Sequence, residues 1–147
     1  MWKKLATLLH TVCLLTLSPY LLAEEITPVP LQRTLCVWDL MGANGDNFSL
    51  MKDYRVAATE WGVNLKLKAY SDEKIATEDF RVGQCDAVVI TGLRAKPFNT
   101  FAGSLESIGS IPTYQHLKMV VSTISSPKAA HLMAQGNYEV AGVMPLG

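Results

Sequence analysis

The sequence contains 147 residues, with 13 basic and 13 acidic side chains and a hydrophobic content of 49%. This length predicts one folded domain with a single modest core. Because the charges balance and no basic patch stands out, a nucleic-acid partner is not expected.

Residues 1–23 have the three regions of a secretory signal peptide. Lys3 and Lys4 precede an apolar run over residues 5–22, and Ala23 stands directly before two glutamates. A cationic start, an apolar segment and a small residue at the cut are typical of such signals. The alternative is a transmembrane anchor, but Ser18 and Pro19 break a run that is barely long enough to span a bilayer. We therefore expect export, removal of residues 1–23 and no stable membrane anchor afterwards.

Residues 24–32 contain two prolines and no periodicity, so we expect an extended leader there. A buried strand over 34–40 and a loop rich in glycine and asparagine over 41–47 follow. The next segment, 48–61, predicts a helix that Asp46 or Asn47 caps and Gly62 ends. Its apolar residues recur at helical spacing and should face the core: Leu50, Tyr54, Ala57, Ala58 and Trp61.

Residues 63–70 alternate between apolar and polar side chains, which predicts an edge strand. A helix over 73–82, with Ile75, Ala76 and Phe80 facing inward, follows a cap at Ser71 or Asp72. Residues 86–90 form a nearly unbroken apolar run, as in a central parallel strand that is covered on both faces. Right-handed crossovers then predict an α/β fold with an open, doubly wound, mostly parallel sheet in the order 2-1-3.

The pattern is less regular after residue 90. We expect a short helical piece over 98–102 and a loop or strand over 104–112. Residues 114–124 fit either a helix or a strand, because β-branched residues occupy part of a helical pattern. A helix over 126–135 and a final strand over 138–144 complete the chain, so residues 33–147 form one α/β lobe.

Cys36 and Cys85 are the two cysteines outside the signal segment. In an exported protein an even number of cysteines favours a disulfide bond. If their strands are parallel neighbours, the two residues lie near the same strand ends and within bonding distance. The alternative is a pair of buried free thiols.

The loops that follow the first and third strands are the predicted ligand site, because ligands of open α/β sheets bind at the carboxyl ends of the strands. Arg94 could hold a carboxylate in a two-pronged contact, and Trp38 could form the floor of a pocket. The alternatives are an ordinary surface arginine and a packed tryptophan, while Asp39 could cap or order the glycine loop. The predicted ligand-binding residues are Trp38, Asp39, Asn44, Asp46, Thr91 and Arg94.

No motif supports catalysis or a cofactor. The loop at 42–45 matches neither a dinucleotide fingerprint nor a phosphate-binding loop, although its N–H groups at a helix start favour an anionic or polar group. No serine occupies a GxSxG elbow, and His116 and His131 lie in helical stretches. Histidine and cysteine spacing predicts no metal site. We therefore expect a protein that is not an enzyme and needs no cofactor.

Three stretches together resemble the N-terminal lobe of periplasmic solute-binding proteins: RTLCVWDLMGANGDNFSLMKDY, WGVNLKLKAYSDEKIATEDF and GQCDAVVITGLRAKPF. Within that class the chain is distantly similar to the binding subunits of TRAP-type transporters. The resemblance covers about residues 33–147 and implies a periplasmic location, a small-molecule solute and a membrane transporter subunit as partner. Such proteins have two lobes, so the resemblance implies a truncated gene product, a fragment or a one-lobe descendant with another task.

We therefore predict a periplasmic solute-binding lobe for a small polar or carboxylated molecule. The alternative is an exported accessory protein that docks on a membrane or periplasmic partner through its C-terminal residues. A hydrolase is the least favoured of the three.

Overall fold

The computed structural model describes residues 29–109 and 111–144. Its sheet contains three parallel strands: β1 (Leu31–Trp38), β2 (Val63–Tyr70) and β3 (Ala87–Val89). Their order is β2-β1-β3, which confirms the predicted α/β fold with an open sheet in the order 2-1-3. β1 starts three residues earlier than predicted, so Leu31 and Gln32 of the expected leader belong to the strand. The expected signal peptide lies outside the described residues.

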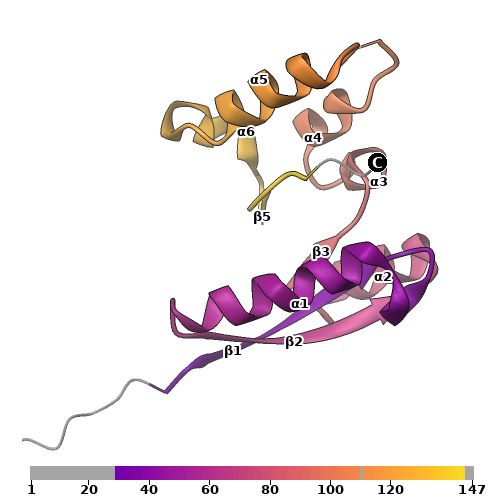
Figure 1. The fold of residues 1–147 in the computed structure, drawn as a ribbon, viewed down its shortest axis with the longest axis vertical. Coiled ribbons are helices and arrows are strands. Elements are labelled where there is room, and N and C mark those ends of the chain that lie inside the picture. The colour runs from indigo at the N-terminus through magenta and orange to yellow at the C-terminus, as the bar shows by residue number, and fades with distance from the viewer. Residues whose placement is uncertain (1–28, 110, 145–147) are drawn as a thin grey trace, which may run out of the picture.

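Two helices cover opposite faces of this sheet (Figure 1). Leu35 and Val37 of β1 point to the face where Phe48 of α1 (Asp46–Thr59) packs against them. Cys36 points to the other face, because side chains alternate along a strand. That second face is covered by α2 (Glu73–Arg81), in which Ala76 is fully buried. The sheet is therefore the middle layer of three.

The predicted apolar face of α1 is only partly correct. Ala58 is buried and Ala57 is half-buried, but Leu50, Tyr54 and Trp61 are partly exposed, Trp61 most of all. In α2, likewise, Ile75 is exposed although it was expected to face inward. Helical spacing gives the direction of a side chain, but burial also needs a neighbouring element. α1 lies over β1 and β2, and on the same face of β3 Val89 packs against the core whereas Ala87 is exposed.

β3 was expected to be a central strand covered on both faces, and that expectation is wrong within the described residues. It pairs with β1 on one side only, and Ala87 is exposed. The chain leaves the sheet after Val89, and the two later strands pair with each other instead. β2 was correctly predicted as an edge strand.

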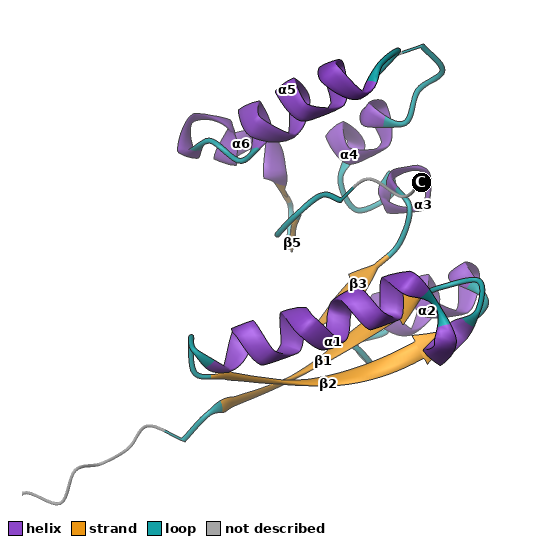
Figure 2. Ribbon diagram, viewed as in Figure 1, coloured by secondary structure: helices purple, strands orange, loops and turns teal. Residues whose placement is uncertain are grey.

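After β3 the chain forms a small helical part above the carboxyl end of the sheet (Figures 1 and 2). Its elements are α3 (Gly92–Ala95), α4 (Thr100–Leu105), α5 (Tyr114–Ile124), the 3-10 turn η2 (Pro127–Ala129) and α6 (Ala130–Met133). The stretch 114–124, which fitted a helix or a strand, is a helix that the side chain of Thr113 caps. The predicted helix over 126–135 ends at Met133 instead of Gln135.

The predicted final strand over 138–144 is much shorter in the structure. Only Tyr138–Glu139 (β5) is a strand, and it forms a hairpin with Ala134–Gln135 (β4) outside the main sheet. The turn between them contains Gly136 with φ of +59°, a conformation that suits glycine. Its apolar residues therefore contribute nothing to the three-stranded sheet.

The predicted disulfide bond joins Cys36 to Cys85, with 5.9 Å between the Cα atoms. Both residues are buried. The bond links β1 to the residues that lead into β3, and it lies where Asp86 N donates to Thr34 O at 2.9 Å. It therefore fixes the start of a strand that has only three paired residues.

Candidate functional site

The loops that leave β1 and β3 lie at the same edge of the sheet, because the two strands are parallel neighbours with Val37 opposite Val89. We call this edge the strand-exit rim and define it by residues 39–47 and 91–96. It contains the 3-10 turn η1 (Gly42–Asn44) and the short helix α3. The arrangement on which the predicted site depends is therefore present.

Asp39 is buried and holds the loop after β1 in place. Its Oδ1 accepts a hydrogen bond from Met41 N at 2.9 Å, and its Oδ2 accepts from Asn47 N at 2.8 Å and Phe48 N at 3.2 Å. The carboxylate thus caps the N-terminus of α1, a role that was expected of Asp46 or Asn47. The anionic group that the loop was expected to attract is the protein's own Asp39.

Gly45 is required for this arrangement because a Cβ atom there would lie 1.7 Å from Asp39 Oδ1. Its backbone is extended, with φ of −87°, so other residues could adopt the same conformation. The constraint at Gly45 is therefore close approach to a side chain and not backbone freedom.

The loop after β3 is also held by carboxylates of the protein. Thr91 N donates to Glu73 Oε1 at 2.7 Å. Gly92 N and Leu93 N donate to the two carboxylate oxygens of Glu106 at 2.6 and 2.7 Å. Sequence reasoning assigned Glu73 only to the helix dipole and missed Glu106, since no local spacing connects that residue to a loop fourteen positions earlier.

Arg94 lies at the rim with part of its guanidinium uncommitted. Its Nε is 3.6 Å from Glu73 Oε2, and its side chain is 46% exposed. Its backbone N–H donates to the Thr91 hydroxyl, which caps α3. Neither Nη atom makes a hydrogen bond to the described residues. Arg94 is therefore an ion-paired surface arginine with free donors that face solvent.

The other predicted residues occupy the ends of the same elements. Trp38 is the last residue of β1 and is half-buried opposite Tyr70 of β2. Asn44 ends η1 and Asp46 begins α1, and both are exposed. The structure thus places five of the six predicted residues on the rim, and Trp38 lies at the strand end just before it.

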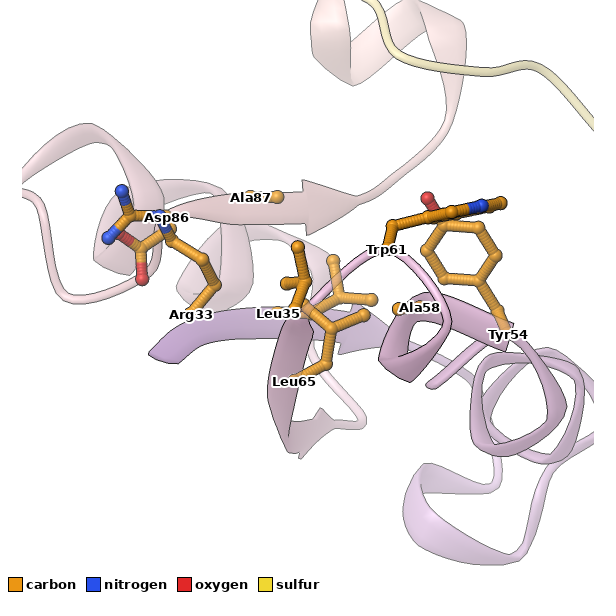
Figure 3. Close-up of a pocket in the computed structure, with 9 residues that line it drawn as sticks. Arg33, Leu35, Tyr54, Ala58, Trp61, Leu65, Asp86 and Ala87 are labelled. Atoms are coloured by element: carbon orange, nitrogen blue, oxygen red, sulfur yellow. The ribbon is translucent and has the colours of Figure 1, made fainter. Parts of the chain in front are cut away.

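A different surface of the described part of the chain contains a hollow. Its volume is about 410 Å³, and it lies on the α1 face near the amino ends of β1 and β3, away from the rim (Figure 3). Sequence reasoning did not identify it, although the aromatic pair at positions 54 and 61 recurs at helical spacing. Its lining residues are Arg33, Leu35, Tyr54, Ala58, Trp61, Val63, Leu65, Asp86 and Ala87.

A hydrogen-bonded cluster lies beside the disulfide on the α2 face. The Tyr70 hydroxyl donates to Asp79 Oδ2 at 2.6 Å and lies 3.4 Å from Cys36 Sγ, and Lys68 Nζ is 3.4 Å from the same Asp79 oxygen. The hydrogen bond from Tyr70 lowers the pKa of Asp79 below its ordinary value of 3.8. Burial, followed by the bond to Asp79, raises the pKa of Tyr70. Hydrogen bonding to Tyr70 raises the pKa of Lys68.

The histidines of the described residues have local partners, and the titratable side chains of that part are not grouped as metal ligands. Among the described residues, no three histidine, cysteine or acidic side chains are grouped to hold a metal ion. The rings of His116 and His131 contact the Thr113 hydroxyl and the Lys128 carbonyl, which are local partners. In that same part of the chain, no helix is long and apolar enough to cross a membrane.

An open α/β sheet whose loops gather at one edge is an architecture that binds ligands at that edge. Comparison with known proteins identifies a family within this class. The family model described as Solute-binding protein AdeT 1/2 matches residues 55–147, and the chain belongs to this family. No solved structure matches the chain.

One curated relative is "Probable solute-binding protein AdeT1" of Acinetobacter baumannii, which is 43% identical over 111 residues. The match covers 76% of this chain and 36% of the relative. The chain therefore spans about a third of the length of the curated relative it matches.

Proposed function

We propose that this chain is the N-terminal lobe of a periplasmic solute-binding protein and recognises a small polar or carboxylated solute for transport. Its membership in a solute-binding family carries the proposal. The parallel pairing of β1 and β3 supports it, because this pairing gathers the loops at a single edge. The export signal, the periplasmic location and a TRAP-like transporter partner belong to the same proposal.

Arg94 is the residue that we assign to a solute carboxylate. The backbone donors of Met41, Asn47, Thr91, Gly92 and Leu93 already donate to carboxylates of the protein. The exposed guanidinium remains available and can take a carboxylate through two parallel donors. Trp38, Asn44 and Asp46 flank the same edge.

Asp39 and Thr91 act as positioning residues in this proposal. Asp39 orders the loop that carries Asn44 and Asp46, and Thr91 caps the turn that carries Arg94. A single lobe encloses much less of a ligand than a closed cleft, in which most of the ligand surface is buried. Binding by this chain alone is therefore weak in our proposal.

The test is a thermal-shift and calorimetric screen of the chain against organic acids and amino acids. We expect weak binding of a carboxylated solute, reduced about tenfold in Arg94→Gln because a hydrogen bond to a charged group is lost. Arg55→Gln is the matched control, since Arg55 is an exposed arginine on α1. Unchanged affinity in Arg94→Gln, or tight binding by the lobe alone, would contradict this half-site.

The second candidate function is an exported accessory protein, and α5 is the observation that favours it. None of the described residues of this helix is buried, and Tyr114, Leu117 and Val121 line a shallow hollow of about 320 Å³ along it. The docking surface was expected beside residues 138–146 instead. In the described part of that segment, Val143 is the one large hydrophobic residue classed as exposed, at 39%.

A further inference from the structure

The hollow on the α1 face has chemically different ends (Figure 3). Arg33 and Asp86 stand at one end, and Tyr54 and Trp61 stand at the other. Between them the floor is apolar and includes Leu35, which is 5% exposed. The volume of this open hollow, about 410 Å³, falls within the range of small-molecule sites, and its lining is mostly apolar with a few polar groups.

The charged end offers one donor group and one acceptor group. Arg33 Nη1 lies 3.7 Å from Asp86 Oδ1, too far for a hydrogen bond, and both side chains are nearly half exposed. Asp86 is held in place because its Oδ2 accepts from Thr34 N at 2.7 Å. Arg33 uses Nη1 in a contact with Gln32 O at 3.3 Å. Asp86 Oδ1 and the rest of the guanidinium therefore remain available to a ligand.

The aromatic end offers two partly exposed rings. The centroids of Tyr54 and Trp61 are 6.1 Å apart in an edge-to-face arrangement, and the side chains are 45% and 66% exposed. A ligand with an apolar body would remove this surface and the floor from water, which is favourable. Ala87 at the start of β3 is exposed, so the hollow is open on that side.

We propose that this hollow binds an α-amino acid with a large apolar side chain. The ligand carboxylate contacts Arg33, the ammonium contacts Asp86, and the side chain lies over Leu35 towards the aromatic pair. A zwitterion fits because the two protein charges are adjacent and opposite, whereas a simple acid or amine would leave one of them facing a like charge. The site lies at the strand ends opposite the rim, so it is additional to the proposed solute site.

The experiment follows the Trp61 indole N–H by NMR while L-phenylalanine is titrated into the disulfide-bonded chain. Three probes each lack one recognition element: 3-phenylpropionate lacks the ammonium, phenethylamine lacks the carboxylate and L-serine lacks the apolar side chain. We expect saturable shifts with phenylalanine, affinity about tenfold weaker for the acid and the amine, and none for serine. Equal affinity for phenylalanine, 3-phenylpropionate and phenethylamine would show a purely apolar surface and overturn the proposal.

Variants assign the binding to this hollow. Arg33→Gln should weaken phenylalanine binding about tenfold, and Arg55→Gln on the exposed side of α1 should not change it. Asp86 also accepts a hydrogen bond from Thr34 N, so the binding result for Asp86→Asn is interpreted only if its circular dichroism spectrum is unchanged. Trp61→Ala is the second variant, and its binding is followed by other amide signals. Unchanged binding in Arg33→Gln and Trp61→Ala overturns the proposal.

Two further measurements distinguish binding in this hollow from binding at the rim and from a contact between two copies of the chain. Amide shifts followed along the whole chain should centre on the lining of the hollow, so shifts confined to rim residues 91–96, with none at Trp61, place the amino acid at the rim and overturn the second site. Sedimentation at increasing protein concentration should show a monomer. Self-association that Trp61→Ala abolishes would show that a second copy covers the hollow instead.

Discussion

At the scale of single residues, Asp39 has the largest structural role at the rim. One buried carboxylate accepts three backbone N–H groups and so connects the end of β1 to the start of α1. A proposed solute contact at this edge therefore depends on a residue that is itself inaccessible. Function and stability are coupled at this position.

We predict that Asp39→Ala lowers the free energy of unfolding by about 3 kcal/mol, because buried donors lose an acceptor that carries charge. Urea denaturation followed by circular dichroism measures this change. Asp53→Ala, at an exposed position of α1, is the control and should change stability by less than about 0.5 kcal/mol. A similarly small effect at Asp39 would show that the loop keeps its structure without the carboxylate.

The cluster of Tyr70 and Asp79 gives a prediction about pH. The folded state lowers the pKa of Asp79, so this stabilisation is present above 3.8 and is lost as pH falls through the lowered value. The folded state raises the pKa of Tyr70, so that contribution is present below 10.0 and is lost as pH rises through the raised value. Tyr70→Phe removes the hydroxyl that links the two groups.

The stability difference between the wild type and Tyr70→Phe should therefore be constant near neutral pH and should shrink below 3.8 and above 10.0. Urea midpoints at acidic, neutral and alkaline pH measure it. Tyr114→Phe is the matched control because that ring is 67% exposed. A difference that does not vary with pH would mean that Tyr70 acts by packing alone.

At the scale of elements, the attachment of β3 depends on few contacts. Three residue pairs join it to β1, and the disulfide closes a loop of 49 positions between Cys36 and Cys85. In the chain-entropy model a cross-link of that span stabilises a protein by about 4 kcal/mol. Loss of this bond should loosen β3 and the rim loop that follows it.

We predict that reduction of the wild type, or replacement of both cysteines by alanine, lowers the free energy of unfolding by up to about 4 kcal/mol. Urea denaturation with and without a thiol reductant measures the effect. The double alanine variant should not respond to the reductant, which makes it the control for unrelated effects of the reagent. Equal stability of the oxidised and reduced wild type would show that the disulfide bond does not stabilise the attachment of β3.

Sequence pattern predicted correctly those elements whose burial depends mainly on segments close to them in the sequence. The alternation over 63–70 correctly gave an edge strand, and the order 2-1-3, taken from right-handed crossovers, correctly placed β1 in the centre. The apolar run at β3 predicted a central strand. A strand is central only when strands pair with both of its edges, and the apolar character of one strand does not determine whether a second neighbour exists. The segment 138–144 failed for the same reason, since no strand of the described sheet pairs with it.

The candidate site was predictable to a similar extent. The edge of the sheet at which the site lies follows from the parallel pairing of β1 and β3. Residues that follow these strands, such as Asp39 and Arg94, could therefore be selected from the strand order in the sequence. Their partners could not, because Glu73 and Glu106 reach the rim through tertiary contacts. The hollow beside Trp61 was missed because it depends on how α1, β1 and the exposed start of β3 are placed together.

At the scale of the whole molecule, the helical part contacts α2, which covers one face of the sheet, through a small aromatic cluster. Phe98 is buried, and its ring centroid lies 5.2 Å from Phe80 of α2 and 4.8 Å from Tyr138 of β5. The neighbouring Asn99 donates to the carbonyls of Leu132 and Met133, which ties α4 to the end of α6. The position of Arg94 therefore depends partly on packing far from the rim.

We predict that Phe98→Ala lowers the free energy of unfolding by about 3 kcal/mol, because it opens a cavity between the helical part and α2. Hydrogen exchange should show loss of protection first in residues 92–144, while β1 and β2 keep theirs, since their core lies on the other face of the sheet. Leu93→Ala is the control, because Leu93 is 70% exposed and belongs to the same part. Equal loss of protection in the sheet and the helical part would mean that the two unfold as one unit, and the aromatic cluster would then be a part of a single core.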